Sequence, residues 1–220
     1  MTNPYPIKWR IAQYLELRWW KNYLSTKNKT DYLLWKRRYW QHFLDQISDV
    51  LAIPDNANIL DAGCGPAGIF TTFTRQRVTA IDPLLPKYAQ EIAHFTPEDY
   101  PNVSFIATPL ERFRPDSPFD IAFCLNAINH VADIQTAFNR LADTVKQGGF
   151  LVISIDAHRH NILKKLFRLL PADALHPHQY SLPDYVQLLE QHPFTILKTQ
   201  CLKQSLIFGY WVIVAQKNGI

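Results

Sequence analysis

The chain has 220 residues, a length that fits one domain with a short extension. Hydrophobic residues make up 47% of the chain and charged residues 19%, a balance typical of a globular protein with a sizeable core. The formal net charge of +4 is mild and the basic residues form no long run, so the composition does not indicate a nucleic-acid partner.

The cysteines and the apolar segments bear on the cellular compartment. Cys64, Cys124 and Cys201 are odd in number and far apart, which predicts reduced thiols and neither a disulfide framework nor a metal site. The first residues include Pro4 and Pro6 and no apolar run, so we expect no signal peptide. No segment reaches the apolar length needed to span a bilayer. Together these features predict a cytoplasmic protein.

Residues 7–48 form an aromatic-rich, basic region. The helical spacing of its apolar residues predicts two helices, divided by a polar break at residues 25–29. Five of the six tryptophans lie here, and we expect residues 1–50 to form an extension that packs on a domain spanning residues 51–220. Two further interpretations stay open for these tryptophans. They form a lid that faces a ligand crevice and stacks on substrate, or they contact a membrane surface, since basic residues alternate with them.

The stretch from Ile59 to Gly68 predicts a ligand site. Buried strand residues run into a glycine-rich turn, and we expect a helix to begin near Pro66 and to point its N-terminal N–H groups into the same crevice. Gly63 and Gly65 let the backbone turn sharply and let a ligand approach closely. A turn of this kind at the carboxyl end of a strand is typical of nucleotide sites in open α/β sheets.

Two carboxylates distinguish between ligand classes at this turn. Asp61, at the strand end before the glycines, would repel a pyrophosphate and attract a cationic amine. Asp82 closes the next strand, residues 78–81, at an edge that we expect to face solvent, where a carboxylate can accept both hydroxyls of a ribose. An amine beside a ribose, with no phosphate between them, describes S-adenosylmethionine (SAM) better than NAD. The spacing of the glycines alone also matches the dinucleotide pattern, which is a weak signal.

Further along the chain, strands alternate with helices, which predicts a parallel sheet with helices on both faces. The expected helices cover residues 84–95, 134–145 after the capping residue Asp133, and 182–191 after a capping box that begins at Ser181. The expected strands cover residues 103–107, 119–124, 150–155, 195–202 and 206–216. The last two strands are close in sequence and predict a terminal hairpin.

The order of these motifs resembles that of the class I SAM-dependent methyltransferases. Leu60-Asp61-x-Gly63-Cys64-Gly65 looks like the first motif of that family, and Phe119-Asp120-Ile121 with Asn126–Val131 is similar to its fourth motif. Residues 141–154 look like the segment that leads into the fifth strand. The resemblance covers about residues 58–156. It implies a Rossmann-like, doubly wound α/β sheet of seven strands, mostly parallel with an antiparallel seventh strand, preceded here by the N-terminal helical extension.

The resemblance also implies roles for individual residues. The glycines of the turn would let the backbone contact the methionine portion of SAM. Asp61 would hold its ammonium group, directly or through water, and Asp82 would accept the ribose hydroxyls. Many relatives place an acidic residue after the third strand to receive the adenine amino group; here Thr108 occupies that register and Glu111 is the nearest carboxylate. Asn126 would lie near the sulfonium. The predicted cofactor-binding residues are Asp61, Gly63, Cys64, Gly65, Asp82, Pro83, Glu111 and Asn126.

Histidines supply the candidate general bases. An oxygen acceptor needs a base to take its proton, and His130, His176 and His178 titrate in the right range. We expect at least one of them to touch the substrate; the alternative for each is a capping, packing or loop residue. An alternative is a metal site formed by His158, His160, His176 and His178. No neighbouring carboxylate or thiol completes this site, so no metal is predicted.

The sequence therefore predicts transfer of a methyl group from SAM to a small molecule, with an oxygen, nitrogen or carbon acceptor left open. Two alternatives remain: a module that binds SAM or S-adenosylhomocysteine (SAH) without turnover, and an NAD-dependent oxidoreductase, against which Asp61 and the terminal hairpin argue. No Asn-Pro-Pro-Tyr signature follows the fourth strand, which argues against a nucleic-acid substrate. The sequence assigns no oligomeric state.

Overall fold

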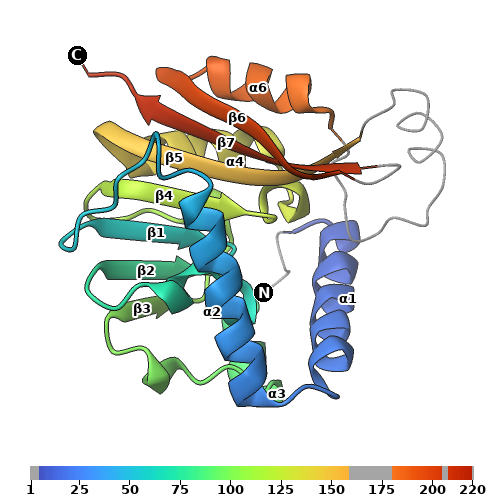
Figure 1. The fold of residues 1–220 in the computed structure, drawn as a ribbon. Coiled ribbons are helices and arrows are strands. Elements are labelled where there is room, and N and C mark those ends of the chain that lie inside the picture. The colour runs from blue at the N-terminus through green and yellow to red at the C-terminus, as the bar shows by residue number, and fades with distance from the viewer. Residues whose placement is uncertain (1–4, 159–179, 205–207, 220) are drawn as a thin grey trace.

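A seven-stranded sheet forms the centre of the protein, with strand order β3-β2-β1-β4-β5-β7-β6 (Figure 1). The structure is a computed structural model and describes residues 5–158, 180–204 and 208–219. The strands are β1 (Asn58–Ala62), β2 (Arg77–Ile81), β3 (Val103–Ile106), β4 (Phe119–Leu125), β5 (Val145–His158), β6 (Phe194–Gln204) and β7 (Phe208–Lys217). Neighbours among β1 to β5 pair in parallel, whereas β7 pairs antiparallel with both β5 and β6. The predicted fold class, including the antiparallel seventh strand, is confirmed.

The central strands of the sheet are buried on both faces. In β1, Ile59 packs in the core on one side and Leu60 in the core on the other, and both side chains are fully buried. This two-sided burial explains why the central strands are continuous apolar runs and do not alternate with polar residues. The helices that supply the two cores are α1 (Ile7–Leu24), α2 (Lys29–Asp45), α3 (Leu85–Glu91), α4 (Ile134–Thr144) and α6 (Leu182–Glu190).

Capping side chains mark the starts of three helices, and two of these caps, Asp133 and Ser181, were predicted. The side chain of Asn28 accepts a hydrogen bond from the N–H of Asp31 at the start of α2, after the predicted polar break. Asp133 accepts one from the N–H of Thr136 at the start of α4. Ser181 forms the predicted capping box at the start of α6. Each cap satisfies a backbone N–H that the helix itself leaves unpaired, which fixes where the helix begins.

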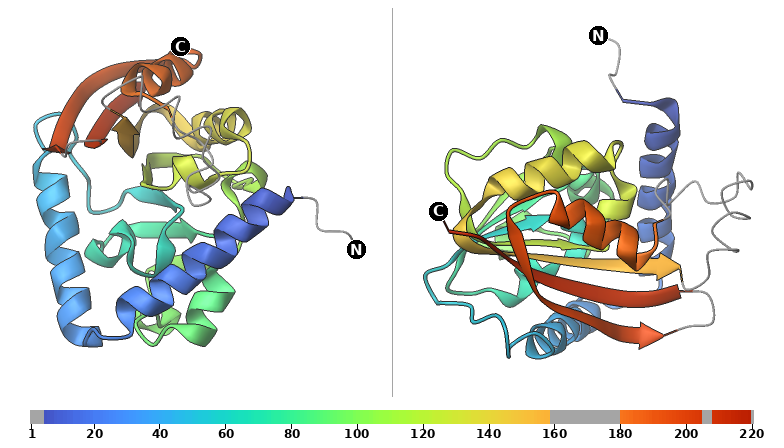
Figure 2. Two further views of the ribbon diagram at one scale, coloured as in Figure 1. Left: turned by 90° about the vertical axis from the view of Figure 1, so that its right-hand side faces the viewer. Right: turned by 90° about the horizontal axis from the view of Figure 1, so that it is seen from above.

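The two N-terminal helices are attached to the sheet very differently. On α2, Tyr32, Trp40 and Phe43 are buried in the same core as Ile59, so this helix shares the core of the sheet. Helix α1 buries only Ala12 and Leu24 among its residues and crosses in front of the carboxyl ends of the strands (Figure 2). It therefore forms a roof over the edge of the sheet where ligands bind in open α/β folds.

The predicted helix near Pro66 is wrong. Two 3₁₀ turns, Gly65–Ala67 and Ile69–Thr72, follow β1, and the chain then enters β2. Helix α2 packs against this segment, since the indole N–H of Trp40 donates to the carbonyl of Ala67 (3.0 Å) and Arg37 donates to the carbonyl of Thr71 (3.0 Å). The position that a helix after β1 would take on the sheet is thus filled by a helix from the N-terminal extension.

Replacement of Trp40 by alanine tests this attachment. The Trp40 side chain is 5% exposed, and its loss removes both the packing and the bond to the 3₁₀ turn. We expect Trp40→Ala to lower the free energy of unfolding by about 3–5 kcal/mol, measured by urea denaturation. Trp35→Ala on the same helix is the matched control, because Trp35 is 51% exposed, and should cost less than about 1 kcal/mol. Equal losses in the two variants would contradict the assignment of α2 to the core.

Candidate functional site

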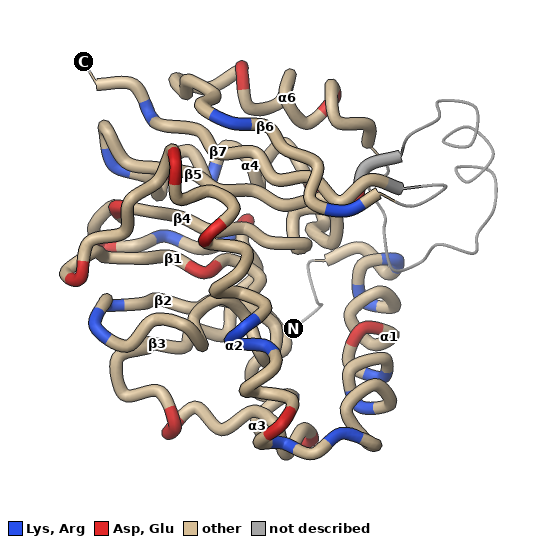
Figure 3. Tube along the Cα trace, in the orientation of Figure 1, with Lys and Arg blue, Asp and Glu red and all other residues tan. Residues whose placement is uncertain are grey.

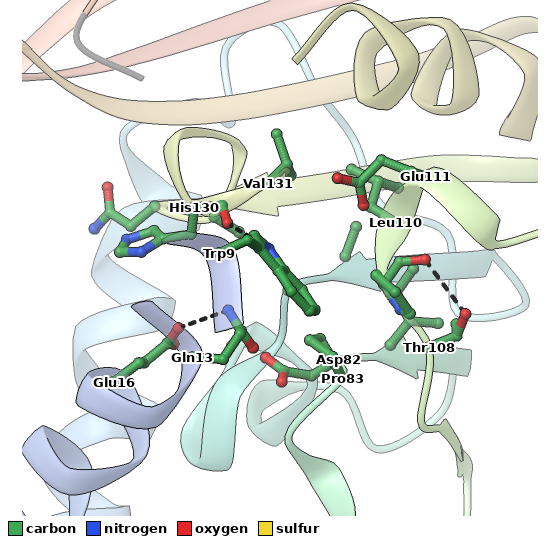
Figure 4. A pocket seen from close by; sticks show the side chains of 16 residues that line it. Trp9, Gln13, Glu16, Asp82, Pro83, Thr108, Leu110, Glu111, His130 and Val131 are labelled. Carbon is green, nitrogen blue, oxygen red and sulfur yellow. Dashed lines mark hydrogen bonds between the residues drawn. The ribbon is translucent and has the colours of Figure 1, made fainter. Parts of the chain in front are cut away.

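A cavity lies under α1, where the carboxyl ends of β1, β2 and β4 meet. The residues that line it come from α1, the glycine turn, the end of β2, the segment after β3 and the segment after β4 (Figure 4). They are Trp9, Gln13, Glu16, Ala62, Gly63, Ile81, Asp82, Pro83, Thr108, Pro109, Leu110, Glu111, Asn126, Ala127, His130 and Val131. We call this the first cavity. It brings together five of the predicted cofactor-binding residues from four separate segments of the sequence.

The glycine turn after β1 has a conformation that other residues could not adopt easily. Gly63 has φ +72° and its N–H donates to the carbonyl of Ile81 (2.8 Å), which ties the turn to the end of β2. A Cβ atom on Gly63 would lie 2.3 Å from the Cβ of Ala127, so the close approach of the β4 segment also requires glycine. Gly65 has φ +56° and faces Trp20 of α1.

The carboxylate of Asp82 stabilises this turn through hydrogen bonds to backbone N–H groups. One carboxylate oxygen accepts the N–H of Gly65 (3.0 Å) and the other accepts the N–H of Leu84 (2.8 Å). The side chain is only 5% exposed, so the expectation that it faces solvent is wrong: α1 and the turn cover it. Burial raises the pKa of Asp82 to about 6, while the two N–H donors oppose that rise.

Asp61 lies behind the turn and lines neither of the cavities described here. Its carboxylate accepts the N–H of Phe70 (3.0 Å) and so caps the second 3₁₀ turn. Burial raises the pKa of Asp61 to about 7, and the positive charge of Lys36 acts in the opposite direction. Gly68 is required beside it, because a Cβ there would come within 2.5 Å of the Asp61 carboxylate. Asp61 therefore shapes the turn and makes no side-chain contact with the cavity.

Glu111 and Asn126 line the first cavity and also organise its walls. One oxygen of Glu111 accepts the N–H groups of Ala132 (2.6 Å) and Asp133 (3.2 Å), which fixes the segment before α4. Asn126 adopts φ +53°, and its N–H donates to the carbonyl and the hydroxyl oxygen of Ser154 on β5 (3.0 and 3.1 Å). The positive φ turns the chain sharply at the end of β4, beside the glycine turn.

A second cavity of about 460 Å³ lies between α1 and α2. Its walls include four aromatic side chains from the two helices, and its floor includes the glycine turn. The lining residues are Glu16, Trp19, Trp20, Lys36, Tyr39, Trp40, Gly63, Cys64, Gly65, Ala67, Gly68, Leu125, Asn126, His130 and Asp156. The tryptophans that the sequence assigned either to packing or to a lid thus divide: Trp40 packs in the core and also lines this cavity, whereas Trp19 stands at its edge, 48% exposed.

Lys36 is the basic residue of the second cavity, and the sequence analysis missed it. Its ammonium lies 4.5 Å from the ring centroid of Trp40 and 5.0 Å from that of Tyr39. Burial lowers the pKa of Lys36 to about 8, and the charge of Asp61 opposes this shift. Among the described residues no carboxylate lies within ion-pair distance of the ammonium. The sequence does carry a signal for this arrangement: Tyr39 and Trp40 follow Lys36 by three and four residues on a predicted helix. This spacing places the three side chains on one face of the helix.

Helix α1 adds three polar or aromatic residues to the first cavity that the sequence did not predict. The indole of Trp9 points into the cavity toward Pro83 (Figure 4), and its N–H donates to the carbonyl of His130 (3.1 Å). Gln13 donates to Glu16 (3.4 Å). Burial and the nearby charge of Asp82 raise the pKa of Glu16 to about 8. The carboxyl groups of Glu16 and Asp82 therefore repel each other in the first cavity, whose described lining residues include no lysine or arginine. Protonation of one of the two carboxyl groups relieves this repulsion.

Comparisons with known proteins show the family of the chain. A family model described as a methyltransferase domain matches residues 32–199, most of the chain. The chain belongs to this methyltransferase family. The prediction of a class I SAM-dependent methyltransferase is thereby confirmed, with SAM as the cofactor.

Relatives with known names match parts of this methyltransferase. A ubiquinone biosynthesis O-methyltransferase from Rickettsia bellii is 35% identical over 98 residues, which is 44% of this chain and 40% of that protein. The chain thus spans less than half the length of this curated relative. The N-methyltransferase NodS from Bradyrhizobium japonicum, solved in complex with SAH, aligns over 89% of this chain and 91% of that one, with a TM-score of 0.62 and 17% identity. The [4+2]-cyclase SpnF aligns over 80% of each chain, with a TM-score of 0.61 and 14% identity. Identities this low show a shared fold alone.

The structure of the methyltransferase places one of the three predicted catalytic residues at the site. His130 lines both cavities, at the end of the segment that follows β4. His176 and His178 lie outside the described residues. In the part of the chain that the structure describes, no group of three or more histidine, cysteine, aspartate or glutamate side chains could hold a metal ion. No described helix is both long enough and apolar enough to cross a membrane.

The pKa of Glu16 predicts a pH-dependent stability. The folded chain binds a proton at Glu16 more tightly than the unfolded chain does, so the free energy of unfolding falls as the pH rises from about 4.5 to about 8. Between these pH values, the free energy of unfolding of Glu16→Gln should fall less than that of the wild type, by on the order of 2 kcal/mol. Urea denaturation at a series of pH values measures this difference. Glu98 is exposed, so the control variant Glu98→Gln should show the same dependence of the free energy of unfolding on pH as the wild type. If Glu16→Gln also shows the wild-type dependence, the raised pKa of Glu16 is refuted.

Proposed function

We propose that this methyltransferase moves the methyl group of SAM to a small molecule bound in the second cavity. One observation carries the proposal: the two cavities share four lining residues, Glu16, Gly63, Asn126 and His130. A cofactor in the first cavity and an acceptor in the second would therefore meet at the glycine turn. The ubiquinone biosynthesis O-methyltransferases match this chain over 44% of its length, which favours an oxygen acceptor without deciding it.

The first cavity and the part of the second that borders it together offer a suitable group to each part of SAM. Asp82 would accept the ribose hydroxyls, and Thr108, Glu111 and the neighbouring apolar residues would receive the adenine ring. The N–H groups and open face of Gly63–Gly65 would contact the methionine portion. Lys36, whose ammonium has no carboxylate partner among the described residues, would pair with the methionine carboxylate. Asp61 would contribute by holding the turn, and not by a direct bond to the ammonium, because it lies behind the turn.

The chain itself would align the two partners and exclude water. SAM supplies a carbon already activated by a sulfonium, so the protein needs mainly to orient the acceptor and to keep the site dry. The aromatic walls of Trp19, Trp20, Tyr39 and Trp40 suit a flat or apolar acceptor. When the acceptor atom carries a proton, that proton has to leave as the bond to the methyl carbon forms. His130 is the described residue proposed to take it, with His176 and His178 as the further candidates from the sequence.

The main alternative is a domain that binds SAM or SAH without methyl transfer. The likeness of the fold to the cyclase SpnF illustrates that this architecture does not by itself determine the reaction. Incubation with SAM and a panel of phenols, amines and carbon acids, with detection of SAH, separates the two functions. SAH release that depends on an acceptor supports methyl transfer; tight SAM binding with no release on any acceptor supports the binding module.

The remaining partner assignments follow from charge and composition. We propose a small-molecule partner and no nucleic acid, because the basic residues of the described chain are spread over several faces (Figure 3). The reduced cysteines favour the cytoplasm as the compartment.

The cofactor assignment predicts a clear order of affinities. We expect SAM and SAH to bind in calorimetric titration and NAD to bind negligibly, because the carboxylate of Asp82 already accepts the N–H of Gly65 and its negative charge would repel a pyrophosphate at the turn. Asp82→Asn keeps an oxygen acceptor for one backbone N–H and should weaken SAH binding about tenfold or more. NAD binding in preference to SAH would overturn the assignment.

The role of Lys36 predicts a separate loss of affinity. Lys36→Met keeps the aliphatic stem against Trp40 and removes the charge, so SAH binding should weaken roughly 10–100-fold in the same titration. Arg38→Met is the matched control, because it removes an exposed charge from the same helix and should leave the affinity within about twofold. An unchanged affinity in Lys36→Met would show that the carboxylate of the cofactor is held elsewhere.

A further inference from the structure

The outer side of α1 carries a ridge of apolar side chains. Ile7, Ile11 and Tyr14 follow each other at helical spacing and are 71%, 47% and 63% exposed. Residues spaced in this way lie on one face of a helix. The opposite face of α1 already has a use, because Trp9, Gln13, Glu16 and Trp20 line the cavities. The ridge therefore does not belong to the site.

Basic residues surround this ridge. Lys8, Arg10 and Arg18 are exposed, and among the described residues none of them forms an ion pair. The acidic residue of α1 is Glu16, which lines the cavities. The outer face of α1, defined as Ile7, Lys8, Arg10, Ile11, Tyr14 and Arg18, thus combines apolar and positively charged side chains without a negative charge.

We propose that the outer face of α1 docks on the surface of an anionic lipid bilayer. A helix with basic residues beside exposed apolar side chains lies in the plane of a membrane interface, where the apolar side chains enter the acyl boundary and the basic ones meet the headgroups. The charge of the face complements an anionic surface. Its position at the edge of the molecule, standing clear of the sheet in Figures 1 and 2, leaves it accessible to a flat partner.

The shape of the face favours a bilayer over an acidic protein. The apolar side chains stand on a convex helix, and a protein partner would need a matching groove to bury them. A fluid bilayer needs no such groove, because the lipids rearrange around the side chains. The docking surface is independent of methyl transfer, since none of its six residues lines either cavity.

Sedimentation with lipid vesicles tests the proposal on the full chain. The wild type should bind vesicles of phosphatidylglycerol and phosphatidylcholine much more tightly than vesicles of phosphatidylcholine alone. The double variant Arg10→Gln/Arg18→Gln should bind the anionic vesicles about 25-fold more weakly, at roughly fivefold for each charge. Ile7→Ser/Ile11→Ser should bind them roughly tenfold more weakly. SAH titration of each variant checks that the cofactor site is intact, and this readout is separate from vesicle binding.

Matched variants elsewhere on the surface complete the test. Arg75→Gln removes an exposed charge near the other end of the strands, and Leu197→Ser removes an apolar side chain that is 40% exposed on β6. Both should bind vesicles like the wild type. Three results would overturn the proposal: no binding of the wild type to anionic vesicles, equal binding to neutral vesicles, or equal losses in the control variants. A wild type that ignores vesicles but binds an acidic protein through Arg10 and Arg18 would assign the face to a protein partner instead.

Discussion

Backbone N–H groups bound to buried carboxyl oxygens hold the loops at the ligand edge of the sheet. Asp82 joins the glycine turn to the segment after β2, Asp61 caps the 3₁₀ turn behind it, and Glu111 fixes the segment before α4. A buried carboxyl group without such partners would be strongly unfavourable, so these loops and carboxyl groups depend on one another. The same bonds leave the open face of the turn toward the cavities. The walls of the site are thus set before any ligand enters.

Helix α2 forms one wall of the second cavity. Because it takes the place on the sheet that a helix after β1 would occupy, its side chains reach the glycine turn directly. Trp40 and Tyr39 bring aromatic surface to the turn, and Lys36 brings a positive charge between them. An N-terminal extension has therefore become part of both the core and the site. Substitutions in α2 would alter the second cavity without any change in the strands that carry the family motifs.

The sequence predicted the features that depend on local patterns. The apolar runs identified the strands, and the caps at Asp133 and Ser181 identified the starts of two helices, because capping is settled within four residues. The helix expected near Pro66 failed because its alternative is non-local: α2 occupies the same surface. The burial of Asp82 and the position of Lys36 were missed for the same reason. Both depend on how the N-terminal helices lie over the sheet, and no spacing within one segment reports that arrangement.

The weak attachment of α1 has a consequence for the exchange of ligands. Helix α1 buries only two of its residues and yet roofs the first cavity through Trp9, whereas α2 is held in the core by Tyr32, Trp40 and Phe43. Regions with few buried apolar contacts open locally at a small fraction of the free energy of global unfolding. The amide hydrogens of α1 should therefore exchange with solvent long before those of α2 or the sheet. Opening of this roof then sets an upper limit on how fast a ligand can leave the first cavity on the side of α1.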